Sequence, residues 1–134
     1  MKRVLVTGSR HWKDRQRLEA EFDSMIKLAF NGEGPFMLIE GACPSGADFL
    51  AKQYAKKKGW EIESHPAEWK KHKKQAGHVR NQKMVDLKPD VIIAFMQQCK
   101  NEQCKNPAFH YSHGTTDCVE RALSARIPLY QVFE

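Results

Sequence analysis

Three short stretches of this sequence combine glycine with side chains that donate hydrogen bonds. They are residues 7–10 (TGSR), residues 41–48 (GACPSGAD) and residues 114–116 (GTT). Glycine lets backbone N–H groups approach an anion closely, and hydroxyl and guanidinium groups add further donors. A helix that starts after such a stretch also presents free N–H groups and the positive end of its dipole. Together the three stretches predict a phosphate-binding site.

Two arginines and one aspartate are suited to the rest of a nucleotide. Arg10 and Arg80 can each form a forked contact with a phosphate, and Asp48 can accept a hydrogen bond from a ribose or base hydroxyl. The alternative roles are surface ion pairs for the arginines and a helix cap for Asp48. The motifs G-x-x-x-x-G-K-[ST] and G-x-G-x-x-G are both absent, which counts against a P-loop ATPase and a standard dinucleotide dehydrogenase.

Soft metal ligands gather in residues 97–113, the longest irregular stretch. We expect a flexible flap that covers a site and binds no metal, because long loops in compact domains often serve as lids. The alternative is a zinc site, although the spacing C-x4-C followed by H-x2-H does not match the usual zinc fingers. Its ligands would be Cys99, Cys104, His110 and His113. With Cys43 and Cys118, the chain has too few cysteines for a disulfide scaffold, so we expect reduced thiols.

The elements that must position these residues alternate along the chain. Apolar runs predict strands at residues 3–7, 36–39, 60–64, 90–96 and 128–133. Helical periodicity predicts helices at residues 14–30, 78–87 and 116–126. A further predicted helix starts at Ser45, which forms a capping box with Asp48, and ends at Gly59. We therefore expect an α/β fold with a Rossmann-like, doubly wound and mostly parallel sheet of about five strands, and helices on both faces. Ligands bind such sheets outside the carboxyl ends of the strands.

Length and composition limit the organisation of the protein. The 134 residues suffice for one domain, residues 1–134. No apolar stretch approaches the length of a membrane span and no export signal is present, so we expect a soluble, cytoplasmic protein without a membrane partner. The formal charge of +6 makes it basic and favours anionic partners, whereas the lysine runs at residues 56–58 and 70–74 are typical of solvated surfaces.

The ordered set of motifs resembles a known family over almost the whole chain. The motifs are VTGSR (6–10), GACPSGAD (41–48), Trp69 with His72, GHVRN (77–81), DVIIAF (90–95) and HGTTD (113–117). This set resembles the YspA, or cpYpsA-related, branch of the SLOG superfamily, which has a Rossmann-like fold and includes the lonely-guy phosphoribohydrolases and DprA. The resemblance implies a nucleotide or nucleotide-derived ligand, no further cofactor, and is compatible with a homodimer or other homo-oligomer. The residues expected to bind the ligand are Gly8, Ser9, Arg10, Gly41, Gly46, Ala47, Asp48, Arg80, Asn81, Gly114, Thr115 and Thr116.

Whether the protein is an enzyme stays open at this stage. The lonely-guy loop G-G-x-G-T-x-x-E ends in a catalytic Glu, but here that place holds Cys118, and Asp117 stands one residue earlier. Our first hypothesis is a nucleotide-binding protein. The alternatives are a nucleoside monophosphate phosphoribohydrolase, with Asp48 or Asp117 as the candidate catalytic carboxylate, and a DprA-like module that binds nucleic acid.

Overall fold

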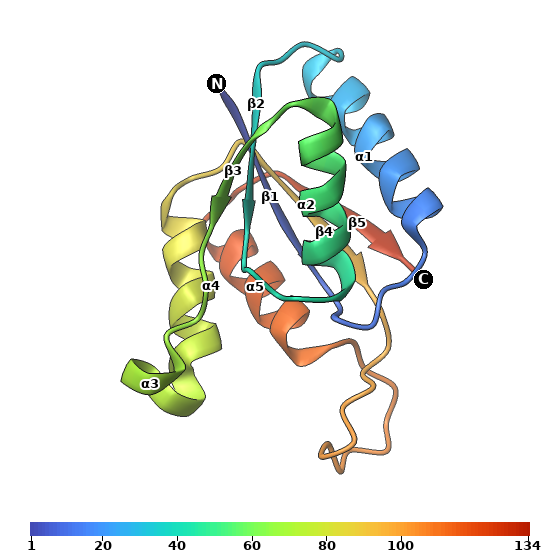
Figure 1. Ribbon diagram of the computed structural model, residues 1–134. Coiled ribbons are helices and arrows are strands. Elements are labelled where there is room, and N and C mark those ends of the chain that lie inside the picture. The colour runs from blue at the N-terminus through green and yellow to red at the C-terminus, as the bar shows by residue number, and fades with distance from the viewer.

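A computed structural model describes all 134 residues and contains one five-stranded sheet (Figure 1). The strands lie in the order β3-β2-β1-β4-β5, and every neighbouring pair is parallel. Their bounds are β1 Lys2–Gly8, β2 Phe36–Glu40, β3 Glu61–Ser64, β4 Val91–Met96 and β5 Leu129–Phe133. The predicted Rossmann-like α/β fold is therefore confirmed.

Helices cover both faces of this sheet (Figure 1). On one face lie α1 (Arg15–Phe30) and α2 (Gly46–Lys58), and on the other lie α4 (Ala76–Asp86) and α5 (His113–Ser124). All six residues of β4 are buried, as expected for a central parallel strand with helices on both sides. None of the helices is long and apolar enough to cross a membrane.

The strand residues alternate between two apolar layers. Val4 and Val6 of β1 pack with the aromatic residues Phe22 and Phe95 under α1 and α2. Leu5, on the opposite face of the same strand, packs in the second layer under α4 and α5. Period-two alternation of this kind fixes the register of each strand, because a shift by one residue would turn every side chain to the wrong face.

The topology places a crevice at the carboxyl end of β1. The chain passes from β1 to β2 on one side and later returns to β4 on the other side of β1. The loops that follow β1 and β4 therefore diverge, which is the arrangement that leaves room for a ligand in open α/β sheets. The structure brings the loops after β1, β2 and β4 to this edge (Figure 1).

Two local predictions were wrong, and two short elements were missed. Helix α5 begins at His113, three residues before the predicted start, so residues 114–116 form its first turn. A short helix α3 (Trp69–His72) and a 3-10 turn (Lys73–Gln75), both missed, follow β3. Ser45 is the N-cap of α2, but it makes no side-chain cap: its hydroxyl donates to the carbonyl of Arg10 (3.1 Å).

Candidate functional site

A small polar cavity of about 120 Å³ lies at the carboxyl end of β1, between α2, α4 and α5. Most of its lining residues carry polar or charged side chains, and only three are hydrophobic. The lining residues are Val6, Thr7, Gly8, Arg10, Cys43, Asp48, Arg80, Asn81, Met84, Ser112, Gly114 and Thr115. The motifs after β1, after β2, on α4 and at the start of α5 therefore converge on one space.

The structure separates the expected binding residues into two groups. Those that line the cavity are Gly8, Arg10, Asp48, Arg80, Asn81, Gly114 and Thr115. The other five, Ser9, Gly41, Gly46, Ala47 and Thr116, lie elsewhere. Ser9 borders an adjoining hollow, whereas Gly41, Gly46 and Ala47 have packing roles.

Asp48 presents a carboxyl group with an unusual pKa. Burial and the neighbouring Glu40 raise the pKa of Asp48 from 3.8 to about 6, although Arg80 and the N–H groups of Cys43 and Gly41 act in the opposite direction. The N–H of Gly41 lies 3.2 Å from Oδ2 of Asp48. Such a carboxyl group exchanges its proton near neutral pH, which is a common property of functional sites.

Arg80 and Asn81 connect the loops around the cavity. Arg80 Nη1 donates to the carbonyl of Gly41 (2.6 Å), and Arg80 Nε donates to Oδ1 of Asn81 (2.9 Å). Asn81 Nδ2 in turn donates to the carbonyl of Gly114 (3.3 Å). A Cβ atom at residue 41 would stand 2.5 Å from Arg80 Nη1, so a larger residue there would displace the guanidinium from this contact. Two of the five N–H donors of Arg80 are thus used within the protein.

The loop after β2 uses its backbone donors on the protein's own carboxylates. Gly41 donates to Asp48, and the N–H of Ala42 donates to Oε1 of Glu40 (2.7 Å). The N–H of Ala47, in the first turn of α2, donates to the carbonyl of Ser9 (3.1 Å). This loop therefore shapes the cavity wall, and few of its N–H groups are left for a phosphate.

Gly46 allows the loop after β2 to pack closely against the loop after β1. Its φ is +76°, and a Cβ atom there would collide with the carbonyl of Ser9 and the backbone of Arg10. A left-handed backbone conformation and this close approach both require glycine. The glycine of this motif is thus explained by packing between the loops after β1 and β2.

The first turn of α5 offers the free donors that the loop after β2 lacks. The first N–H groups of a helix have no partner within it, and the N-cap residue Ser112 makes no side-chain cap. Gly114 is exposed, and nothing lies within 4 Å of the place where its Cβ would be. Arg10 is exposed and lines the same cavity as this turn. Free N–H groups, the helix dipole and a guanidinium together favour an anion here.

A larger hollow of about 640 Å³ adjoins the cavity and shares Arg10, Ser112 and Gly114 with it. Residues 99–103 of the segment between β4 and α5 form its far wall. Its volume is within the range of sites for small organic ligands. The two spaces together can hold a ligand that is anchored at the start of α5 and extends in both directions.

Asp117 lies outside the cavity. Its carboxylate accepts from Asn81 Nδ2 and Arg121 Nε (both 2.9 Å) and pairs with His78 Nδ1 at 3.0 Å. Burial raises the pKa of Asp117, but the hydrogen bonds from Arg121 and Asn81 outweigh this effect and lower it overall. Asp117 therefore joins α4 to α5, and Thr116 faces the same outer side.

Sequence reasoning missed several polar residues around the cavity. Glu40 ends the apolar strand β2, is only 1% exposed, and has one carboxylate oxygen without a partner. A charged residue at the end of an apolar run was the available signal. Thr7, Cys43 and Ser112 also line the cavity. Thr7 and Cys43 stand inside the predicted stretches 7–10 and 41–48, and Ser112 directly precedes the motif HGTTD (113–117), so their positions were the available signal.

Comparison with known proteins identifies the family of this chain. Residues 2–72 match the family model described as "YspA, cpYpsA-related SLOG family", which is more than half of the chain. The Gene 61 protein of Mycobacterium phage D29 is 33% identical over 134 aligned residues, which cover 96% of this chain and 94% of that protein. The matched family segment includes β1, the loop after β2 and Asp48.

Proposed function

Because the chain belongs to the YspA, cpYpsA-related SLOG family, we propose that it binds a nucleotide or a nucleotide-derived ligand at the carboxyl edge of β1 and β4. One observation carries this proposal: the cavity sets the carboxyl group of Asp48 and the guanidinium of Arg80 beside the uncapped start of α5. An anion site and a hydroxyl-accepting group thus line one space. A phosphorylated sugar carries both matching groups.

The geometry supports one orientation of this ligand. The phosphate lies at the first turn of α5, where Gly114 and Thr115 provide N–H groups and Arg10 provides charge. The sugar hydroxyls face Asp48, whose carboxylate accepts hydrogen bonds when ionised. The remainder of the ligand extends into the hollow bordered by residues 99–103.

The phosphoribohydrolase is the second candidate, and the pKa of Asp48 favours it. Hydrolysis of an N-glycosidic bond breaks the bond between C1′ and the base, adds the hydroxyl of water to C1′ and transfers a proton to the departing base. A carboxyl group with a pKa near 6 can orient that water or stabilise the positive charge that develops on the ribose. Asp117 is less suited to this role, because three side chains of the protein already contact its carboxylate.

A ligand panel tests both candidates. Thermal shift is measured with nucleoside 5′-monophosphates, di- and triphosphates, NAD, ADP-ribose, ribose 5-phosphate and a short single-stranded oligonucleotide, because a ligand that binds the folded state raises its apparent stability. We expect stabilisation by one or more phosphorylated nucleotides and none by the corresponding nucleosides. Chromatography of the same mixtures then detects free base. Equal effects of nucleosides and nucleotides would contradict the proposed phosphate site.

The oligonucleotide in the panel addresses the DprA-like alternative. Trp69 is 59% exposed on α3 and is followed directly by Lys70 and Lys71, and an exposed aromatic beside basic side chains is suited to stack on bases. Binding by this surface would depend steeply on salt and survive Arg10→Ala. Binding in the cavity would be lost in that variant.

A further inference from the structure

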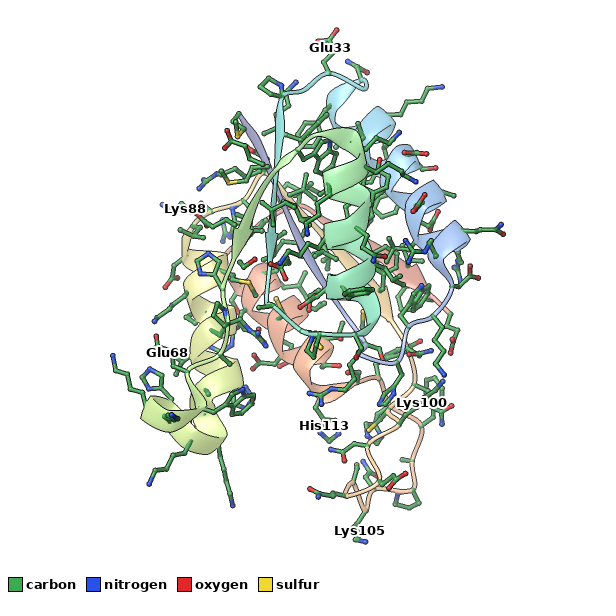
Figure 2. All side chains as sticks on the ribbon, in the orientation of Figure 1. Glu33, Glu68, Lys88, Lys100, Lys105 and His113 are labelled. Atoms are coloured by element: carbon green, nitrogen blue, oxygen red, sulfur yellow. The ribbon has the colours of Figure 1, made fainter.

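Four side chains in the segment between β4 and α5 converge on one point. Their ligand atoms, two thiol sulfurs and two imidazole nitrogens, all lie within 4.8 Å of one another. They belong to Cys99, Cys104, His110 and His113. The segment projects from the body of the molecule, with His113 at its base and Lys105 near its tip (Figure 2).

Four of the six distances within this cluster are close to the edges of a zinc tetrahedron. Zinc–sulfur bonds of about 2.3 Å and zinc–nitrogen bonds of about 2.0–2.1 Å give sulfur–nitrogen edges of about 3.6 Å and nitrogen–nitrogen edges of about 3.4 Å. Cys104 Sγ lies 3.5 Å from Nε2 of His110 and 3.6 Å from Nε2 of His113. Cys99 Sγ lies 3.7 Å from Nε2 of His113, and the two Nε2 atoms are 3.1 Å apart.

The surrounding backbone holds the ligands in this arrangement. Gln98 and Tyr111 form an antiparallel bridge, and the N–H of Cys99 donates to the carbonyl of His110 (2.8 Å). Nδ1 of His110 lies 2.8 Å from the carbonyl of Ala108. Histidine ligands of metals usually donate their second ring N–H in this way, which leaves Nε2 for the metal.

The segment has little else to hold its shape. Most side chains between Gln98 and Phe109 are exposed, and even the large apolar Phe109 is 66% exposed. A loop of this length without an apolar core is expected to be mobile unless another interaction replaces the missing core. Four convergent ligands provide such an interaction.

We propose that Cys99, Cys104, His110 and His113 bind one Zn²⁺ ion as a structural site. Two thiolates and two neutral imidazoles complete the coordination, so no position is left for a catalytic water, and binding releases the thiol protons. Sulfur and imidazole ligands select zinc over Mg²⁺ and Ca²⁺. The sequence predicts a flap without metal, because the spacing of these cysteines and histidines differs from that of zinc fingers. The structure favours a metal site instead, because the folded segment between β4 and α5 brings the four residues together despite that spacing.

The site has a consequence for the start of α5. His113 is the first residue of that helix and directly precedes Gly114. A metal bound there fixes the first turn of α5 and the loop wall of the adjoining hollow at the same time. The zinc site therefore stabilises the proposed anion site and the hollow beside it, which Cys99 and His113 help to line.

Metal content is the direct test. The full chain is expressed without added zinc, and zinc is measured per chain by elemental analysis. We expect about one equivalent in the unmodified protein and less than a tenth in Cys99→Ser and Cys104→Ser, with Cys43→Ser as the control that keeps its zinc. Zinc that persists in the double variant Cys99→Ser/Cys104→Ser would overturn the proposal.

Cobalt gives a readout that does not depend on folding of the variants. Metal-free protein is prepared with a chelator and titrated with Co²⁺, a spectroscopic substitute for Zn²⁺ that binds such ligands more weakly. We expect saturation at one equivalent, visible bands of tetrahedral cobalt, a thiolate-to-cobalt charge-transfer band, and loss of all of them after one equivalent of Zn²⁺. Absence of the charge-transfer band would refute thiolate ligation.

Proteolysis tests the structural role of the metal. Trypsin can cleave after Lys100 and Lys105, both exposed on this segment (Figure 2). We expect cleavage at these two sites to be at least tenfold slower with zinc than after chelation, and cleavage at the lysines of α2 to be unchanged. Equal rates with and without zinc would show that the metal does not order the segment.

Discussion

Substitution of Asp48 by asparagine should change how the stability of the protein depends on pH. The pKa of Asp48 is raised from 3.8 to about 6 by burial and by the nearby Glu40. Between these two values the carboxyl group keeps its proton in the folded protein and loses it in the unfolded chain. Unfolding therefore releases a proton, and the contribution of Asp48 to the free energy of unfolding falls as pH rises from about 4 to about 6.

The magnitude follows from the interval between the two pKa values. At about 1.4 kcal/mol per pH unit, the interval corresponds to a loss of about 3 kcal/mol, complete above pH 7. The asparagine side chain does not ionise, so the free energy of unfolding of Asp48→Asn relative to the unmodified protein should rise across this window and then stay level. The variant has one amide oxygen in place of two carboxylate oxygens to accept from the two backbone N–H groups. This change adds a constant difference in the free energy of unfolding between the two proteins, but it does not alter how that difference depends on pH.

Urea denaturation at half-unit steps from pH 4 to pH 8, at constant ionic strength, measures this difference. Asp117→Asn is the matched control, because the pKa of Asp117 is lowered from its ordinary value of 3.8, so the difference between this variant and the unmodified protein should stay nearly level from pH 4 to pH 8. Its carboxylate stabilises the fold above the ordinary pKa, and that stabilisation is lost as pH falls through the lowered value. The reasoning about Asp48 would be refuted by a difference between Asp48→Asn and the unmodified protein that does not change between pH 4 and pH 7.

Four further substitutions distinguish the roles of other residues. Arg10→Ala should weaken nucleotide binding by about ten- to a hundredfold in calorimetry, whereas Arg126→Ala, which removes the same charge from the opposite end of α5, should not. Arg80→Ala should lower affinity by a similar factor and also reduce the melting temperature, because Arg80 holds the loop after β2. Asp117→Asn should leave affinity within about threefold and abolish no turnover, and free base whose release collapses in this variant would contradict this. Gly46→Val should lower the melting temperature strongly in the absence of any ligand, because the new side chain meets the backbone of Arg10.

The fold was predictable because local patterns of apolar residues identify most of its helices and strands. The apolar run of β4 and the four-residue spacing of Leu18, Phe22 and Ile26 in α1 identify a buried strand and a helix without any tertiary information. The short helix α3 was missed because its residues, WKKH, show neither apolar periodicity nor a cap. The start of α5 was misplaced because glycine and two threonines are weak helix formers by themselves.

The site was predictable only in part, because the partners of a polar group depend on packing. The sequence indicates that Gly46 and Asp48 belong to one functional loop, but not that Gly46 is required by the backbone of Arg10 or that Asp48 accepts the N–H of Gly41. Which helix N-terminus keeps free donors is likewise a tertiary property. Cys99 and His113 are fourteen residues apart and approach each other only because the chain between them folds back on itself. No local sequence pattern predicts this turn.

A crystal structure of the protein with the nucleotide that gives the largest thermal shift tests the central claim most directly. We expect phosphate oxygens about 2.7–3.1 Å from the N–H groups in the first turn of α5, the guanidinium of Arg10 beside them, and a sugar hydroxyl hydrogen-bonded to Asp48. A phosphate bound instead at the lysines of α3, with the cavity between Asp48 and Gly114 free of ligand, would contradict it.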